Sequence, residues 1–120
     1  MKGDKHFSMA DRLKSFKYAI NGIRVFITQE HNARIHVLAA IVAVVLGFMC
    51  NLCSLEWIVV LIAIAMVFIA EIFNTAIERL CDFVHPECNQ AIKEIKDLSA
   101  GAVLVSAALA ITIGIILLLV

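Results

Sequence analysis

Proline and glycine are scarce in this sequence, and the glycines are never clustered. There is one proline, Pro86, and the five glycines stand alone at positions 3, 22, 47, 101 and 114. The chain therefore lacks a G-x-x-x-x-G-K-[ST] loop and a kinase-type glycine-rich loop, and it also lacks a serine hydrolase elbow and an H-E-x-x-H zinc motif. These absences exclude the common phosphate-binding loops, so a bound nucleotide would need another kind of site.

Charged residues are missing from three long stretches, at positions 35–55, 57–70 and 98–120. With 62% hydrophobic residues and a mean hydropathy of +0.97, the chain is too apolar for a soluble domain of this size. All ten Lys and Arg residues lie within positions 2–34 or 79–96. Because basic residues concentrate on the inner side of a membrane, we expect a multi-pass protein with a cytoplasmic N-terminus.

The hydrophobic pattern predicts an all-α membrane protein with a single domain over residues 1–120. An amphipathic surface helix is expected at about 8–30, lying in the headgroup region or packed on the rest of the protein. Membrane helices are expected at about 35–53, 57–84 and 97–120, joined by a turn at 51–56 and a short cytoplasmic segment at 87–96. The pair Cys50 and Cys53 is interpreted as small buried residues rather than as part of a disulfide framework.

The second apolar run carries the most informative residues. Residues 57–70 measure only about 21 Å as a helix, so a span of the usual thickness must include Glu71 and Asn74. An uncompensated ionisable group at membrane depth costs about 2.5 to 3.5 kcal/mol. On a continuous helix, Glu71, Asn74, Glu78 and Asp82 share one face. This polar stripe must therefore face protein, water or metal.

The residues near one membrane boundary are those that phosphoryl transfer requires. That reaction needs carboxylates for a divalent metal, cations for phosphate and a base beside the acceptor hydroxyl. The acids are Glu30, Glu71, Glu78, Asp82 and Asp97, and the cations are Arg12, Lys14, Lys17, Arg24, Arg34 and Lys96. A small cation- or proton-coupled transporter would also bury a glutamate, so it stands as the alternative. The four histidines are assigned structural or surface roles.

One long motif resembles a known family. It reads Glu71-x-x-Asn74-Thr-Ala-Ile-Glu78-x-x-x-Asp82, then Lys96-Asp97-x-x-Ala-Gly-Ala-Val, and it is preceded by Lys14-Ser-Phe-x-Tyr18-Ala, Gly22-Ile-Arg24 and Glu30-x-Asn32-x-x-x-His36. These spacings resemble the small bacterial integral-membrane lipid kinases, the diacylglycerol kinase and undecaprenol kinase family. Residues 86–94 depart from the family's pattern, so no adenine contact is assigned there.

The resemblance implies ATP- and Mg²⁺-dependent phosphorylation of a membrane lipid alcohol, undecaprenol or diacylglycerol, at the cytoplasmic face of the bacterial inner membrane. It implies a homotrimeric helical bundle with shared active sites and no nucleic-acid partner. Glu71 matches the general base, and with Asn74 it would contact the lipid. Glu30 and Glu78 match the metal ligands. The expected nucleotide-binding residues are Lys14, Tyr18, Gly22, Glu30, Asn74, Glu78, Lys96 and Asp97.

Overall fold

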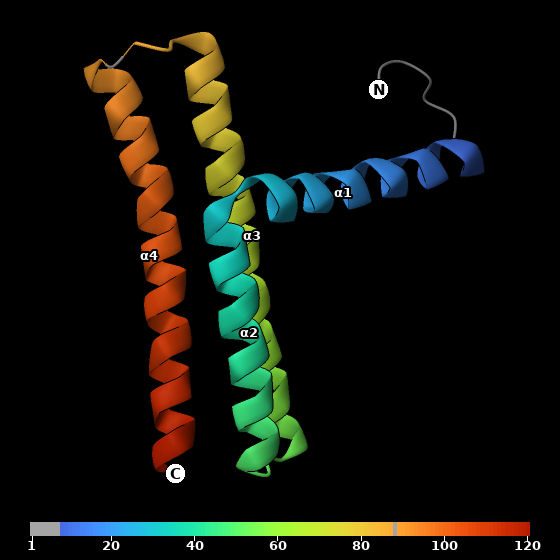
Figure 1. Cartoon of the computed structure of the whole chain (residues 1–120), viewed down its shortest axis with the longest axis vertical. Coiled ribbons are helices and arrows are strands. Elements are labelled where there is room, and N and C mark those ends of the chain that lie inside the picture. Colours follow the sequence, from blue (N-terminus) through green and yellow to red (C-terminus); the bar gives the residue numbers. More distant parts are fainter. Residues whose placement is uncertain (1–7, 88) are drawn as a thin grey trace.

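A computed structural model describes residues 8–87 and 89–120, and this part of the chain folds into four helices. They are α1 (Met9–Gln29), α2 (His31–Met49), α3 (Ser54–Val84) and α4 (Gln90–Leu119). In Figure 1, α2, α3 and α4 run alongside one another as a long bundle, whereas α1 extends sideways from it. The all-α prediction of one surface helix followed by three long apolar helices is confirmed.

The first helix begins where the sequence predicts, because the Ser8 side chain accepts a hydrogen bond from the Asp11 amide. Its apolar stripe is not covered by the bundle. Phe16 is 68% exposed, and Leu13 and Ile20 are similarly open. A helix that projects from a membrane bundle with an uncovered apolar face is suited to lie in the headgroup region.

The junction between α1 and α2 is a sharp elbow at Glu30, whose backbone is extended (φ −106°, ψ 121°). The last carbonyls of α1 would otherwise lack partners at this point. The Arg34 guanidinium donates to the Thr28 carbonyl at 2.6 Å and to the Ile27 carbonyl at 3.4 Å. These bonds hold the elbow, and with it the position of Glu30 beside the bundle.

The turn between α2 and α3 occupies residues 50–53, slightly earlier than the predicted 51–56. Asn51 adopts a left-handed backbone (φ 54°), and the Leu52 amide reaches back to the Gly47 carbonyl, as in a Schellman motif. Glu56 accepts a hydrogen bond from the Cys53 amide at 2.9 Å, which caps the new helix. Cys50 and Cys53 are both exposed, so the prediction that they are buried is wrong. They flank the turn that ends α2 and starts α3.

The connection between α3 and α4 is shorter than expected. Helix α3 ends at Val84, just before His85 and Pro86, as proline disfavours helix in the preceding residue. Asn89 then caps α4, accepting a hydrogen bond from the Ile92 amide at 2.8 Å. The helix therefore begins seven residues before the predicted span at 97, and its first two turns are polar.

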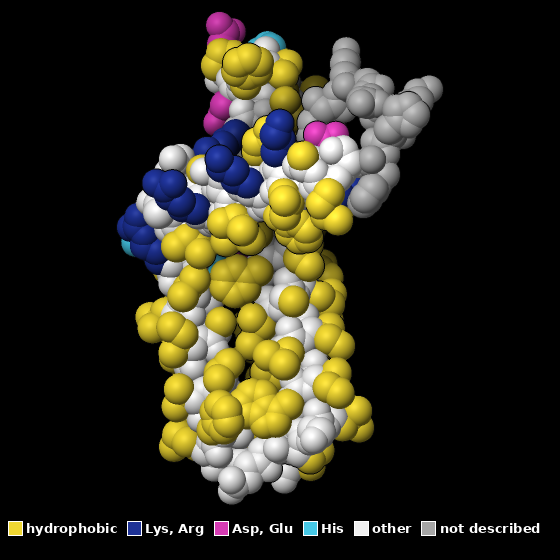
Figure 2. All heavy atoms as spheres, turned by 90° about the vertical axis from the view of Figure 1, so that its right-hand side faces the viewer, with side chains coloured by type: hydrophobic (Ala, Val, Ile, Leu, Met, Phe, Trp, Pro, Cys, Tyr) yellow, Lys and Arg dark blue, Asp and Glu magenta, His cyan; other side chains and the backbone are white. Residues whose placement is uncertain are grey.

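The bundle is built for an apolar environment. Each of α2, α3 and α4 is long and apolar enough to cross a membrane. Among the described residues the buried apolar core is small, consisting of Phe26, Ala33, Val60, Ala63, Val67 and Cys81. Figure 2 shows basic side chains gathered at the level of α1 and hydrophobic side chains over most of the bundle below it. The chain is therefore a membrane protein whose polar groups concentrate at one end.

The contact between Gly47 on α2 and Trp57 on α3 yields a stability prediction. A Cβ added at Gly47 would lie 2.6 Å from Trp57 Cη2, so Gly47→Ala should destabilise the protein by about 1–3 kcal/mol. Thermal unfolding in detergent measures the effect. The control is Gly114→Ala, because a Cβ there meets nothing within 4 Å. Equal melting temperatures for the two variants would contradict this packing, and Trp57→Phe should partly rescue Gly47→Ala.

Candidate active site

The polar stripe predicted on the second membrane helix lies on α3, at the end of the bundle near α1. Glu71 is its deepest member, about 21 Å along the helix from Trp57, and only 6% of the residue is exposed. A carboxylate buried at this depth requires a polar partner. The structure supplies one from another helix.

That partner is His36, in the second turn of α2. Its Nε2 atom lies 2.7 Å from Glu71 Oε1, and the two residues are 35 positions apart in the sequence. The short distance is typical of a hydrogen bond in which at least one group is charged. The contact joins α2 to α3 at Glu71, the residue that the family resemblance implies as general base.

One turn further along α3, Asn74 links two other polar residues. Its amide nitrogen donates to Glu78 Oε1 at 2.8 Å, and its amide oxygen accepts a hydrogen bond from Ser99 Oγ at 2.7 Å. Ser99 is buried on α4. Since both ends of the amide have partners, Asn74 is fixed in orientation and holds the Glu78 carboxylate in place.

Glu30 reaches this region from the elbow. Arg79, the residue after Glu78, places Nη2 at 3.4 Å from Glu30 Oε1 and at 3.1 Å from Gln29 Oε1. The two predicted metal ligands, Glu30 and Glu78, therefore belong to elements that are in contact. Figure 1 shows the elbow lying against α3.

Lys96 and Asp97 point to different partners. Lys96 Nζ lies 2.7 Å from Asp82 Oδ1 and ties α4 to α3, whereas Asp97 pairs with Lys93 at 2.6 Å on α4 itself. Lys93, Asp97 and Asp82 are largely exposed and Lys96 is partly exposed, so these pairs contribute little to stability. The ion pair places Lys96 beside Asp82, the outermost member of the polar stripe, where water has access.

Three predicted nucleotide-binding residues lie apart from the stripe. Lys14, Tyr18 and Gly22 are spaced by four positions on exposed parts of α1, and together they form one face of that helix. Helix α1 extends away from α3 and α4 (Figure 1). Within one protomer these residues are therefore not brought together with Asn74, Glu78 and Lys96.

No group of three or more His, Cys, Asp or Glu side chains in the part of the chain that the structure describes is arranged to hold a metal ion. The carboxylates that are present still suit Mg²⁺, which takes oxygen ligands and commonly binds to one or two carboxylates plus phosphates and water. Glu78 and Glu30 provide such oxygens, and both already accept hydrogen bonds from neighbouring donors. These carboxylate oxygens suit a metal ion that is bound together with phosphate.

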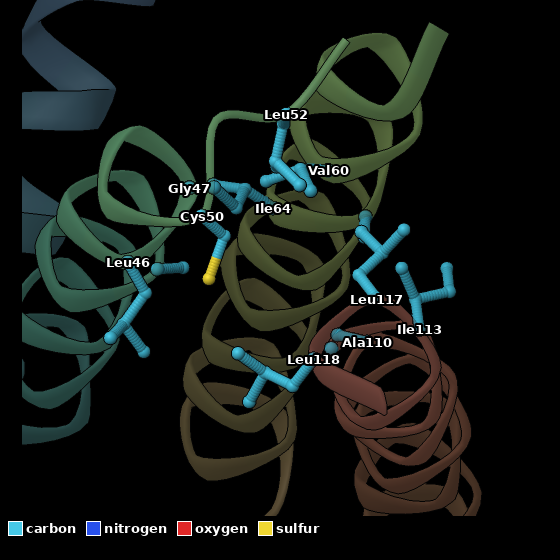
Figure 3. A pocket seen from close by; sticks show the side chains of 13 residues that line it. Leu46, Gly47, Cys50, Leu52, Val60, Ile64, Ala110, Ile113, Leu117 and Leu118 are labelled. Atoms are coloured by element: carbon cyan, nitrogen blue, oxygen red, sulfur yellow. The ribbon is translucent and has the colours of Figure 1, made fainter. Parts of the chain in front are cut away.

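Two apolar hollows flank the helices. One, with a volume of about 160 Å³, lies near Gly47, Cys50 and Leu117 at the far end of the bundle (Figure 3), and its lining is apolar except for the Cys50 thiol. The other, about 340 Å³, lies between α2, α3 and α4 and includes His36 in its wall. The second hollow therefore joins an apolar, alanine-lined surface to the buried polar pair.

Sequence reasoning missed three members of this cluster. From the sequence, His36 is assigned a structural or surface role, and neither Ser99 nor Arg79 is placed at the site. A signal for His36 existed, because a polar side chain at the start of an apolar run needs a partner. Neither Ser99 nor Arg79 carries a comparable signal, since their contacts depend on how separate helices align.

Comparison with known proteins identifies the family. A family model described as prokaryotic diacylglycerol kinase matches residues 17–118. An undecaprenol kinase from Bacillus subtilis (strain 168) is 35% identical over 106 residues, which cover 88% of this chain and 86% of that protein. A diacylglycerol kinase from Synechocystis sp. is 32% identical over 103 residues, covering 85% of this chain and 59% of that protein. These matches show that the chain, with its three apolar helices and its acidic stripe on α3, belongs to the prokaryotic diacylglycerol kinase family of lipid kinases.

Proposed function

We propose that the protein transfers the γ-phosphoryl group of ATP to the hydroxyl of a membrane lipid alcohol, in a Mg²⁺-dependent reaction at the cytoplasmic face of the inner membrane. The observation that carries this proposal is the position of Glu71, a buried carboxylate at membrane depth beside a set of oxygen ligands. Family membership supports a kinase over the transporter alternative.

In this reaction Glu71 acts as the general base. The lipid oxygen attacks the γ-phosphorus, a new O–P bond forms, the bond between the γ-phosphorus and the bridging oxygen breaks, and ADP leaves. The hydroxyl proton passes to the Glu71 carboxylate. A base at this depth suits a lipid acceptor, whose hydroxyl sits near the membrane surface and whose chains stay in the apolar layer.

The residues that would hold Mg²⁺ are Glu78 and Glu30. When bound, the ion would neutralise phosphate charge and increase the electrophilicity of the γ-phosphorus. Asn74 keeps the Glu78 carboxylate oriented through its 2.8 Å hydrogen bond, and Arg79 keeps Glu30 close to α3. Lys96, beside the polar stripe, would contribute positive charge toward the nucleotide.

The lipid is undecaprenol or diacylglycerol. The Asn-Thr-Ala-Ile-Glu sequence at 74–78 and the stretch around Glu30 resemble those of undecaprenol kinases, and one relative with that name aligns over most of both chains. The apolar hollow of about 340 Å³ beside His36 offers a surface for a lipid chain whose hydroxyl reaches Glu71. Either alcohol has an apolar chain that could occupy it.

The active enzyme is proposed to be a homotrimer with shared sites, with the N-terminus in the cytoplasm. Basic residues cluster at the end of the bundle that carries the polar stripe, which supports this orientation. The exposed face of α1 with Lys14, Tyr18 and Gly22 would serve the nucleotide of a neighbouring protomer. This arrangement would explain why these residues lie away from α3 in a single chain.

A direct assay tests the proposed reaction. The purified protein is reconstituted in lipid, offered undecaprenol or diacylglycerol separately with ATP, and assayed for lipid phosphate with and without Mg²⁺. We expect Mg²⁺-dependent product from at least one alcohol. The kinase proposal fails if neither alcohol is phosphorylated while the reconstituted protein retains its helical content.

The role of Glu71 is tested by Glu71→Gln, which preserves shape but removes the base. Turnover should fall about 10²-fold or more, the scale on which a positioned base contributes. Glu56→Gln is the matched control, since Glu56 caps α3 at the opposite end and glutamine can still accept the Cys53 hydrogen bond. Near-normal turnover in Glu71→Gln would show that another group takes the proton.

Glu78→Gln tests the metal assignment. The substitution removes a charge, yet the new amide oxygen can still accept the hydrogen bond from Asn74. The Mg²⁺ concentration for half-maximal activity should rise at least about 10-fold, the scale seen when even an outer partner of a metal ligand is lost. Titration of activity with Mg²⁺ at fixed ATP measures this, and an unchanged Mg²⁺ requirement would exclude Glu78 as a ligand.

A further inference from the structure

The imidazole of His36 contacts the carboxylate of Glu71, the proposed base. We propose that His36 is a positioning residue, which donates a hydrogen bond from Nε2 to Glu71 Oε1 and so directs Oε2 toward the lipid hydroxyl. The inference rests on the proposed function, in which Glu71 is the base. It adds a residue on a different helix that acts on the reaction only through Glu71.

The geometry favours a defined orientation for the carboxylate. The Nε2 to Oε1 distance is 2.7 Å, and only 7% of the Glu71 side chain is exposed, compared with 22% for His36. Phe68, one turn before Glu71, contacts the imidazole edge-on, with ring centroids 6.4 Å apart. Helix α3 thus holds the ring at two points, which restricts both the imidazole and the carboxylate.

The nearest polar residue on the same face of α3 is already engaged. Asn74 uses its amide nitrogen for Glu78 and its amide oxygen for Ser99. The polar partner that the structure gives Glu71 is therefore His36. A buried carboxylate needs a hydrogen-bond partner, and with Oε1 engaged by His36 the other oxygen, Oε2, is left for the lipid hydroxyl.

With these roles, the bonds and the proton are accounted for over one turnover. Oε1 of Glu71 keeps its hydrogen bond from His36, and Oε2 takes the proton of the lipid hydroxyl as the new O–P bond forms and ADP departs. His36 does not contact the reacting hydroxyl, and none of its bonds changes in this step. Its contribution is the placement of Oε2, and misplacement of a reacting group by about 1 Å can cost about 10²-fold in rate.

Two substitutions separate hydrogen bonding from packing. His36→Leu fills the space without a donor, whereas His36→Gln places an amide N–H near the position of Nε2. We expect His36→Leu to lower kcat by about 10- to 100-fold with little change in KM for ATP, and His36→Gln to recover most of the loss. Thermal unfolding of both variants in detergent checks that they are folded. Wild-type kcat in folded His36→Leu would overturn the proposal.

A double-mutant cycle tests whether His36 acts through Glu71. In the Glu71→Gln background, His36→Leu should cause little further loss, because the base that it positions is already absent. An equal fold-loss in both backgrounds would mean that His36 acts independently of Glu71, which overturns the proposal. If Glu71→Gln keeps wild-type turnover, the base assignment fails as well.

A spectroscopic readout does not depend on kinase activity. With ¹⁵N-labelled histidine, the His36 Nε2 resonance in detergent micelles should move in Glu71→Gln and stay in place in Glu56→Gln. An unmoved resonance would overturn the contact even in an active enzyme. A chain that shows the shift but phosphorylates no lipid would refute the proposed function and, with it, the positioning role, while leaving the contact established.

Discussion

A carboxylate at membrane depth is the constraint on which the rest of the structure depends. Glu71 lies about 21 Å along α3 from Trp57, where an unpaired charge is unfavourable by several kcal/mol. The fold responds by burying it between helices and placing His36 at 2.7 Å from across the bundle. The hydrogen bond between His36 and Glu71 helps to set the position of α2 relative to α3. The same bond stabilises the buried carboxylate and orients the proposed base.

The length of α3 would allow one helix to reach both proposed reactants, an apolar lipid and a water-soluble nucleotide. Its 31 residues extend about 46 Å, well beyond the roughly 30 Å hydrocarbon layer. Glu71 lies inside the apolar layer, and Asn74, Glu78 and Asp82 follow on the same face toward the aqueous end. Because a helix is a rigid spacer, the depth of Glu71, the proposed base, relative to Glu78, the proposed metal ligand, is set by their spacing in the sequence.

This rigidity explains why much of the fold and part of the site could be predicted. Apolar run lengths gave the three membrane helices, and 3.6-residue periodicity placed Glu71, Asn74 and Glu78 together. The contacts of His36, Ser99 and Arg79 escaped prediction because they depend on the register between helices far apart in sequence. The helix starts at Ser54 and Gln90 were also missed, since they depend on caps by Glu56 and Asn89, which a hydropathy pattern does not reveal.

A single protomer has a small apolar core and leaves two surfaces of α1 uncovered, which a second copy would contact. Its apolar core is small among the described residues, and α1 presents a hydrophobic stripe and the Lys14–Tyr18–Gly22 face without cover from its own bundle. Lipid can cover the stripe, whereas a neighbouring protomer would bring the Lys14–Tyr18–Gly22 face and the polar stripe of α3 to the proposed nucleotide. In the proposed trimer, the bend at Glu30 would direct α1 toward a neighbouring protomer, while the Glu30 carboxylate stays beside α3 of the same protomer. The Arg34 and Arg79 contacts that hold this elbow would then connect subunit assembly to the placement of Glu30.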